Sequence, residues 1–318
     1  MSALTSPPRT TAQPVAAWDF GDFPYGLEPL VMPPVGQAPA DAEHQPLTVP
    51  PCDPERVCVE LSVLSGQEPA GPALLAAPPI AAYDQLFWFR WITGHQVTFA
   101  LWHLTGRLIA EASAHGAPQP GVLERLETYT HAYCAMLLYS GSCPRGVYQS
   151  LIRPVMFLQH RAFSGTWAPD FAPVRALYRG RPLPWLNDER AAGLRAAIDT
   201  HRAVHDSVAA RLVPSGHSLL QQTMAQTPVR PSERTAALYD NFFMTLRGPV
   251  SDAAVAAQLL RRLRAVALDL AGNGLYPLGR DDDAEVWHGS VAACERRIGA
   301  ILPEAARHAA RLVDGPKR

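Results

Sequence analysis

Apolar residues recur at every third and fourth position along residues 80–114, which is the spacing of one face of an α-helix. They are Leu86, Trp88, Trp91, Ile92, Phe99, Trp102, Leu108 and Ile109. A half-buried strand would instead alternate with a period of two, and residues 57–64 are the one weak candidate for that pattern. The sequence therefore predicts an all-α protein without internal repeats, containing one long helix rich in aromatic residues.

Further helices are expected between breaks marked by proline and glycine. They cover residues 121–139, 147–163, about 188–213, two or three segments within 231–271, and a pair within 283–312. Residues 164–187 are rich in Pro, Gly and Trp and are expected to form a connecting loop. Because 318 residues suffice for one large buried core, we predict a single helical domain over residues 56–318.

Residues 1–55 are a proline-rich N-terminal arm. Twelve of the 31 prolines fall in residues 1–54, and proline both blocks helix interiors and removes backbone donors. The arm nevertheless carries a run of aromatic residues between Trp18 and Tyr25, more than a solvated tail needs. We expect an irregular arm that lies against its own subunit or against a neighbour, which would allow a homodimer.

The composition excludes several classes of partner. The formal net charge is −1, so no basic excess is present to neutralise the phosphates of a nucleic acid. No stretch approaches the ~20 apolar residues of a membrane span, and no signal peptide is evident. The five cysteines form no CxxC pair, which favours reduced thiols and a cytoplasmic location. The nucleotide-binding and hydrolase motifs GxGxxG, GxxxxGK, GxSxG and HExxH are absent.

His95 is the first informative residue, because it lies on the aromatic face of the predicted helix 80–114. An imidazole in such surroundings loses its solvation, which favours the neutral form and prepares it to accept a proton. His95 is therefore a candidate general acid–base. The alternative is a core histidine that is simply bonded to a carbonyl group.

His201 and His205 are the second informative pair, one turn apart on the predicted apolar stripe of helix 188–213. We expect both rings to point inward. Such a pair can chelate one metal ion, or one ring can be the axial ligand of a large planar cofactor while the other lies beside it. The remaining alternative is a hydrogen-bonded pair in the core. A mononuclear metal site would need a third ligand, and the sequence does not indicate one.

The surroundings of His95 resemble the distal helix of tryptophan 2,3-dioxygenase. The matching segments are Tyr83-Asp84-Gln85-Leu86-Phe87, Thr93-Gly94-His95-Gln96 and Leu101-Trp102. In that family the histidine lies above the haem on the substrate side, and an aromatic residue four positions earlier packs on the substrate. The resemblance thus implies a helical bundle of the tryptophan-dioxygenase type, with Trp91 in the substrate pocket.

The surroundings of His205 extend the resemblance. The proximal haem ligand of the family is a histidine followed six residues later by an arginine, and here Arg211 stands at that position. The resemblance implies that His205 is the axial ligand of the iron and that Arg211 belongs to the haem site. His201 replaces a tryptophan of the family and would be the neighbour of the ligand. The reverse assignment, with His201 as the ligand, remains open.

A third match, residues 146–153, is similar to the family segment that leads to an arginine on the substrate carboxylate. It implies that Arg153 forms a bidentate pair with an amino-acid carboxylate and that Tyr148 contributes to the pocket. The glycine-rich loop that follows the proximal helix in the family is replaced by residues 214–218. The chain thereby looks most like the bacterial haem-dependent L-tyrosine 3-hydroxylases of natural-product pathways. In one relative a cysteine four residues after the histidine holds the haem; here Ala209 stands there, so noncovalent haem b is expected.

The resemblance predicts a haem enzyme that hydroxylates L-tyrosine to L-DOPA with hydrogen peroxide, or with O2 and a reductant, in antibiotic or other natural-product biosynthesis. His205 would hold the iron and His95 would move protons. Arg153 would bind the carboxylate. The residues expected to wall the pocket are Trp88, Trp91, Phe99 and Tyr148.

Three alternatives stay open. The first is a haem dioxygenase or monooxygenase that acts on tryptophan or another indole. The second is a non-haem metal enzyme that uses His201 and His205. The third is a non-catalytic helical binding protein, whose histidines are merely packed. The sequence leaves the oxidant, the oligomeric state and the pathway open.

Overall fold

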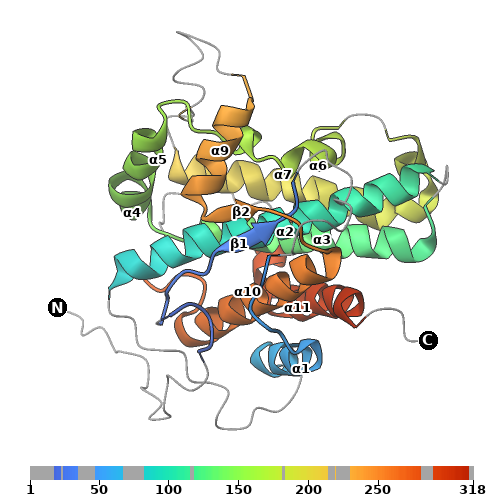
Figure 1. Ribbon diagram of the computed structural model, residues 1–318, viewed down its shortest axis with the longest axis horizontal. Coiled ribbons are helices and arrows are strands. Elements are labelled where there is room, and N and C mark those ends of the chain that lie inside the picture. The colour runs from blue at the N-terminus through green and yellow to red at the C-terminus, as the bar shows by residue number, and fades with distance from the viewer. Residues whose placement is uncertain are drawn as a thin grey trace.

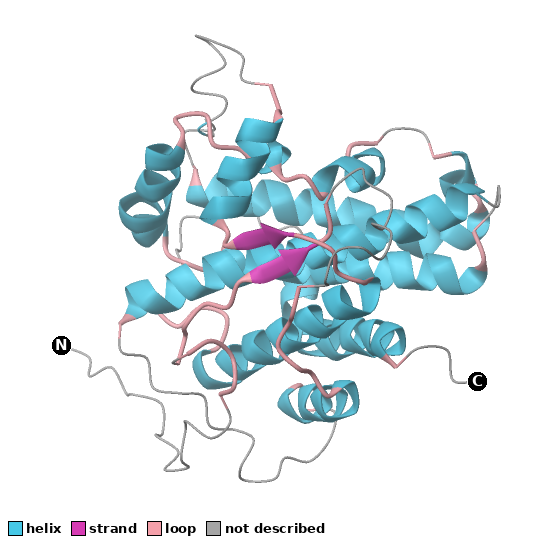
Figure 2. Ribbon diagram, viewed as in Figure 1, coloured by secondary structure: helices cyan, strands magenta, loops and turns pink. Residues whose placement is uncertain are grey.

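The computed structural model describes residues 18–22, 24–34, 47–66, 82–114, 118–180, 183–213, 219, 230–280 and 289–314. This part of the chain is mainly helical (Figure 2), which confirms the all-α prediction. The helices are α1 (Pro54–Leu64), α2 (Tyr83–Ala114), α3 (Pro120–Ser140), α4 (Arg145–Val147), α5 (Arg153–Gln159), α6 (Phe171–Tyr178), α7 (Ala192–Leu212), α9 (Glu233–Phe242), α10 (Asp252–Asn273) and α11 (Gly289–Val313). Shorter helical turns are η1 (Tyr148–Ile152, a π-helix), η2 (Gly165–Trp167), η3 (Pro184–Asn187) and η4 (Glu189–Ala191).

Two groups of helices build the core. Helices α2, α3 and α7 lie along one another, and α10, α11 and α1 form a second group beneath them (Figure 1). Helix α3 joins the groups, because it packs against α2, α7 and α11. Helices α4, α5 and α9 stand together at one end of α2 (Figure 1). This end of the bundle includes the part of α2 that carries His95.

Several predicted boundaries differ from the structure. Residues 57–64, the weak strand candidate, belong to α1, whose first turn is capped by the Asp53 carboxylate on the Arg56 N–H at 3.0 Å. The expected loop 164–187 contains α6, since its apolar residues Phe171, Val174 and Leu177 recur at helical spacing and are buried. Periodicity over so short a segment is hard to detect between prolines.

Other predicted segments are divided or joined differently. The expected helix 147–163 is split into η1 and α5 and ends at Gln159. The described part of the expected pair 283–312 is the single helix α11, which continues through Pro303. Residues 281–288 lie outside the described residues. Between α9 and α10 the chain forms a short strand, β2 (Thr245–Arg247), which pairs in parallel with β1 (Leu30–Met32).

The described part of the N-terminal arm packs on the helical body of its own subunit. The Trp18 and Tyr25 rings lie 5.4 and 5.5 Å from the Phe89 ring of α2. Buried Gln258 of α10 holds β1 through both backbone groups of Val31, with two hydrogen bonds of 2.8 Å. The arm is therefore bonded to α10 and, through β1, to the segment that follows α9.

A buried ion pair fixes α2 against α10. The Arg90 guanidinium forms a bidentate pair with the Asp269 carboxylate at 2.7 and 3.0 Å, and the Tyr139 hydroxyl of α3 donates to the same carboxylate at 2.7 Å. Arg90 also donates to the carbonyls of Gly274 and Leu275. Because a buried charge is stable only when it is fully paired, this network holds three helices in one register. It lies one turn before His95 on α2.

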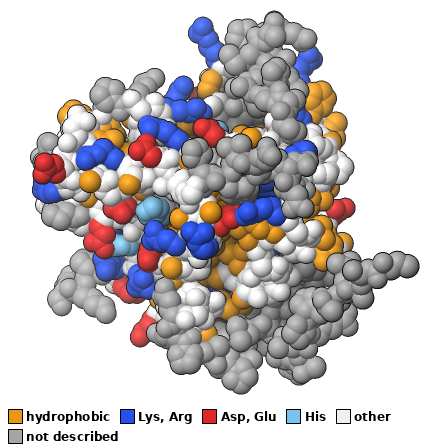
Figure 3. Space-filling view, turned by 180° about the vertical axis from the view of Figure 1, so that it is seen from behind, with side chains coloured by type: hydrophobic (Ala, Val, Ile, Leu, Met, Phe, Trp, Pro, Cys, Tyr) orange, Lys and Arg blue, Asp and Glu red, His pale blue; other side chains and the backbone are white. Residues whose placement is uncertain are grey.

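The described part of the face seen from behind shows no single dominant charge (Figure 3). Acidic and basic side chains are interleaved on the described part of the face seen from behind (Figure 3). None of the described helices combines the length and the apolar character that crossing a bilayer requires.

Candidate active site

His95 is held by the backbone of its own helix. Its Nδ1 lies 2.6 Å from the carbonyl oxygen of Trp91, so Nδ1 carries the proton and donates it. In the neutral ring, Nε2 is then the basic nitrogen. Burial lowers the pKa of His95 to about 4, and the hydrogen bond to Trp91 offsets only part of this effect. The ring is thus a neutral base near pH 7, and its partner is the carbonyl expected for a packed core histidine.

Three aromatic rings lie next to the imidazole of His95. The Phe243 ring, just after α9, stacks on His95 with a centroid distance of 4.5 Å and an angle of 19°. The Trp91 ring lies 4.4 Å away and the Phe99 ring 6.4 Å away. Trp88 faces a different neighbour, Phe242 of α9, at 5.8 Å. Aromatic residues of α2, α9 and the residue after α9 therefore cluster around His95, and their role as the wall of a substrate pocket stays a prediction.

The aromatic residues of α9 were missed by the sequence analysis. Tyr239 and Phe243 are buried, and their rings lie 5.6 and 5.3 Å from Phe99. The signal available was three aromatic residues within 239–243, at helical spacing. That signal shows an apolar face, yet only the packing of the chain shows that this face covers His95.

A glycine allows α3 to approach α2 next to His95. A Cβ added at Gly94 would collide with the hydroxyl of Ser140, the last residue of α3. The side chain of Ser140 therefore occupies the space that any larger residue at position 94 would need. The glycine of the Thr93-Gly94-His95 motif has a packing reason in this chain.

Tyr148 and Arg153 lie at the same end of α2. Buried Tyr148, in the π-helix η1, has its ring 5.7 Å from Trp91. Its hydroxyl is hydrogen-bonded to the Arg153 side chain. Burial raises the pKa of Tyr148, and the adjacent arginine lowers it in part. The structure thus brings together His95, Trp91, Tyr148 and Arg153, although 58 residues separate His95 from Arg153 along the chain.

The two histidines of α7 differ in exposure, which corrects the expectation that both rings point inward. His201 is buried, with 6% exposure, whereas the His205 side chain is 49% exposed. Residues 204 and 205 are both near the predicted apolar stripe, and Val204 rather than His205 continues the buried face. His205 therefore lies at the edge of this face, accessible from outside the core.

The surroundings of the two rings also differ. The His205 Nδ1 lies 3.2 Å from the Asp206 carboxylate, a contact that the sequence analysis did not anticipate. His201 packs between Tyr133 and Tyr178, each with a centroid distance of 4.7 Å, and neither ring nitrogen has a hydrogen-bond partner among the described residues. Burial, with His205 as the second cause, lowers the pKa of His201 to about 3. His201 is a neutral aromatic ring in the core.

Arg211 connects the end of α7 to the segment that carries Tyr148. It is buried and donates to the Cys143 carbonyl at 3.1 Å. In the opposite direction, Arg145 donates to the Arg211 carbonyl at 3.0 Å, and Gln149 donates to the Leu212 carbonyl at 2.7 Å. Arg211 thus stabilises the contact between the predicted proximal and substrate-binding segments.

The two histidine regions belong to one aromatic core. Phe99 of α2 is 5.8 Å from Trp102, Trp102 is 5.3 Å from Tyr133 of α3, and Tyr133 is 4.7 Å from His201. These contacts run from His95 to α7 through three helices. The two histidine regions are therefore linked by a continuous series of ring contacts.

The donor set fits a haem held by one axial histidine. Metal-bound histidine commonly has one ring nitrogen hydrogen-bonded to a carboxylate or carbonyl and the other directed to the metal. His205, with Nδ1 at Asp206 and a half-exposed ring, matches this arrangement. Within the described part of the chain, no three His, Cys, Asp or Glu side chains form a cluster for a bare metal ion. Haem needs only one such ligand from the protein.

Residues 54–192 match the family model described as SfmD 3-methyl-L-tyrosine peroxygenase. The match agrees with the resemblance found in the sequence: this segment is similar to a family of haem peroxygenases related to the tyrosine-hydroxylating, tryptophan-dioxygenase-like enzymes. The matched segment contains His95, Tyr148 and Arg153, and it ends at the start of α7, before His201 and His205. The family supports an oxidoreductase that depends on haem. A comparison with curated proteins found no match.

Proposed function

We propose that the protein is a haem-dependent peroxygenase that hydroxylates L-tyrosine next to the phenol oxygen, giving L-DOPA, with hydrogen peroxide as the oxidant. The observation that carries this proposal is the match of residues 54–192 to a haem peroxygenase family. The family is named for 3-methyl-L-tyrosine, so a ring-methylated tyrosine is a second substrate to test. Both substrates carry a phenol and an amino-acid carboxylate, and the activity would belong to natural-product biosynthesis.

His205 would hold the haem iron. The proposal rests on the Asp206 contact and the exposed ring edge, and on a family register in which Arg211 follows six residues later. His201 is the alternative ligand: neither of its nitrogens has a hydrogen-bond partner in the described part of the chain, but the ring is enclosed by Tyr133 and Tyr178. Ala209 provides no thiol for a covalent link, so the haem would be noncovalent haem b. The bound haem supplies the oxidising chemistry of the reaction.

His95 would act as the proton acceptor of the reaction. Its Nε2 is basic because Nδ1 is occupied by the Trp91 carbonyl, and burial keeps the ring neutral near pH 7. It would take a proton from peroxide or from the substrate phenol and return it later. A positioned general acid–base of this kind contributes ~10²–10⁴ in rate. The Phe243 and Trp91 rings would shield the imidazole from water and hold its orientation.

Arg153 would bind the carboxylate of the amino acid. Its side chain is hydrogen-bonded to Tyr148, whose ring borders Trp91. Tyr148 would thus help to orient the Arg153 guanidinium. An arginine that is already oriented loses less entropy when it forms a bidentate pair with a carboxylate. Trp91 and Phe99 would form the apolar wall against the ring, and Trp88 would support it through Phe242.

The test uses the purified full-length chain, reconstituted with haemin where it is isolated without haem. L-tyrosine, 3-methyl-L-tyrosine and L-tryptophan are incubated in parallel, once with hydrogen peroxide and once with O2 and ascorbate, and the products are analysed by mass spectrometry. The gain of one oxygen by a tyrosine substrate with peroxide supports the proposal.

Three other outcomes would contradict it. The gain of oxygen by tryptophan alone would indicate an indole oxygenase. Turnover only with O2 and reductant would show that O2, and not hydrogen peroxide, is the oxidant. A protein that binds no haemin and shows no Soret band would be either a non-haem metal enzyme or a helical binding protein, and elemental analysis separates these two.

A further inference from the structure

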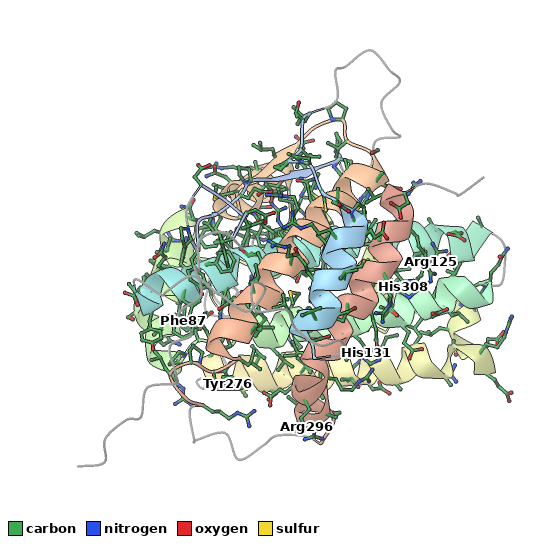
Figure 4. All side chains as sticks on the ribbon, turned by 90° about the horizontal axis from the view of Figure 1, so that it is seen from below. Phe87, Arg125, His131, Tyr276, Arg296 and His308 are labelled. Atoms are coloured by element: carbon green, nitrogen blue, oxygen red, sulfur yellow. The ribbon has the colours of Figure 1, made fainter. Side chains whose placement is uncertain are left out.

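Two cysteines meet at the contact between α3 and α11. The thiols of Cys134 on α3 and Cys294 on α11 are hydrogen-bonded to each other, and they are 0% and 4% exposed. Both are free thiols. Helices α3 and α11 pack directly on each other, and His131, one turn before Cys134, lies beside α11 (Figure 4). The proposed mechanism of tyrosine hydroxylation uses neither thiol.

The two thiols are not equivalent. The hydrogen bond from Cys134 lowers the pKa of Cys294, burial opposes this effect in part, and the Arg297 charge one turn along α11 adds to it. The same hydrogen bond and burial raise the pKa of Cys134. Cys294 is therefore the thiol of the pair that loses its proton more readily, and the thiolate is the form that attacks peroxide. It also lies in the second turn of α11, and helix ends open more readily than helix centres.

We propose that Cys134 and Cys294 are a peroxide-oxidised disulfide site that links α3 to α11. In the first step, the Cys294 sulfur attacks one oxygen of hydrogen peroxide; the O–O bond breaks, Cys294 becomes a sulfenic acid, and the second oxygen leaves as water after taking up the thiol proton. In the second step, the Cys134 sulfur attacks the sulfenic sulfur, and the hydroxyl group leaves as water with the Cys134 proton. Two thiols are oxidised, and one peroxide is reduced to two waters.

The placement of the pair gives the disulfide a structural consequence. Cys134 follows Tyr133, whose ring lies 4.7 Å from His201 and 5.3 Å from Trp102. A bond from Cys134 to α11 would hold this stretch of α3 in place beneath the aromatic core. It would also prevent further oxidation of Cys294, because a sulfenic acid that has been resolved by a second thiol is not converted to the sulfinic acid. The inference rests on the proposed function only for the supply of peroxide.

The experiment treats the full-length protein, in the haem-loaded form, with equimolar hydrogen peroxide and then alkylates the remaining thiols. Five thiols are titratable under denaturing conditions before treatment, and we expect three after it. A non-reducing tryptic digest should contain residues 126–145 joined to residues 281–296, with a mass two hydrogens below the sum of the two peptides. Reduction with dithiothreitol should restore all five thiols. Since residues 126–145 also contain Cys143, fragment ions must place the link at Cys134.

Variants complete the test. In Cys294→Ser, Cys134 should remain a free thiol after the same treatment. In Cys134→Ser, Cys294 should stop at the sulfenic acid with one equivalent of peroxide and proceed to the sulfinic acid when a second equivalent is added. Cys58→Ser, a substitution of a half-buried thiol in α1, should form the disulfide as the parent does. Five thiols that survive peroxide, a link through Cys143, or a sulfinic Cys294 in the parent chain would overturn the proposal. Tyrosine hydroxylation is read by a different product, so either proposal can fail while the other holds.

Discussion

The α2 region around His95 and the α7 region around His201 and His205 show two uses of histidine in one core. At His95, a backbone carbonyl occupies Nδ1 and stacked rings hold the imidazole, so a single basic nitrogen remains. At His205, a carboxylate lies at Nδ1 while half of the ring is open. The first arrangement is suited to moving a proton, and the second to holding a metal. The role of each histidine therefore depends on the partner of one ring nitrogen and on the access to the other, and burial alone does not determine it.

The largest expected effect concerns haem binding and separates the two rings of α7. In His205→Ala, we expect loss of the Soret band after reconstitution with haemin, because the iron has no axial ligand. The matched control His201→Phe should retain most of the band, since phenylalanine fills the space between Tyr133 and Tyr178. Absorption spectra and haem content measure both. Loss of the band in His201→Phe but not in His205→Ala would show that His201 is the ligand.

The next effect concerns the α2 region alone. His95→Gln should lower kcat for tyrosine hydroxylation by ~10²–10⁴ while haem binding is unchanged, because the proton acceptor is lost and the iron ligand is intact. The measurement is steady-state kinetics with saturating peroxide, together with the Soret spectrum. A fall in kcat below about tenfold would show that His95 is a packed core residue after all.

A smaller effect should follow from the carboxylate anchor. Arg153→Met removes a charged hydrogen bond worth ~1.5–3 kcal/mol, so KM for L-tyrosine should rise by roughly 10- to 100-fold with a smaller change in kcat. Tyramine, which lacks the carboxylate, provides the control substrate. Its KM should be nearly equal in the parent and the variant. Equal losses for both substrates would indicate that Arg153 only supports the fold through Tyr148.

The last effect concerns acid stability rather than activity, and here the two regions should behave alike. The pKa values of His95 and His201, about 4 and about 3, lie below the usual value of about 6.5 for histidine because burial disfavours the charged ring. Their neutral forms therefore stabilise the fold fully above pH 6.5. This stabilisation is lost as the pH falls, since the unfolded chain takes up the protons first.

Urea unfolding at pH 7.5 and pH 4.5 tests whether the free energy of unfolding falls with pH as expected. The parent protein should lose stability at the lower pH, and His201→Phe should lose less, by on the order of 2–3 kcal/mol. His95→Phe should show a change in the same direction. A variant whose stability falls with pH as steeply as that of the parent would show that the histidine is protonated in the folded state.

The sequence predicted the fold class and the long helices well, and the contacts between them poorly. The apolar period of residues 80–114 located α2 within a few residues of its observed ends. The same pattern could not choose between Val204 and His205 as the buried residue, because adjacent positions on a helix lie only about 100° apart. The side of α7 that meets α3 decides this, and that choice depends on residues far away in the chain.

The residues of the candidate site also fall into two groups, those predicted from the sequence and those missed. His95 and its aromatic neighbours on α2 were predicted from local patterns, and Arg153 from the resemblance, since each lies in a motif that can be read along the chain. Phe243 was missed because its packing on His95 depends on how α9 lies on α2. The pairing of Cys134 with Cys294 was missed because 160 residues separate them.

Local chemistry was thus determined by the sequence itself: the helical period, the aromatic face of α2, the glycine before His95 and the positions of three histidines. The tertiary structure decided which side chains lose contact with water and which atoms become partners. Burial and hydrogen bonding between distant segments are collective results of packing, and they set the pKa of His95, the exposure of His205 and the contact between the two thiols.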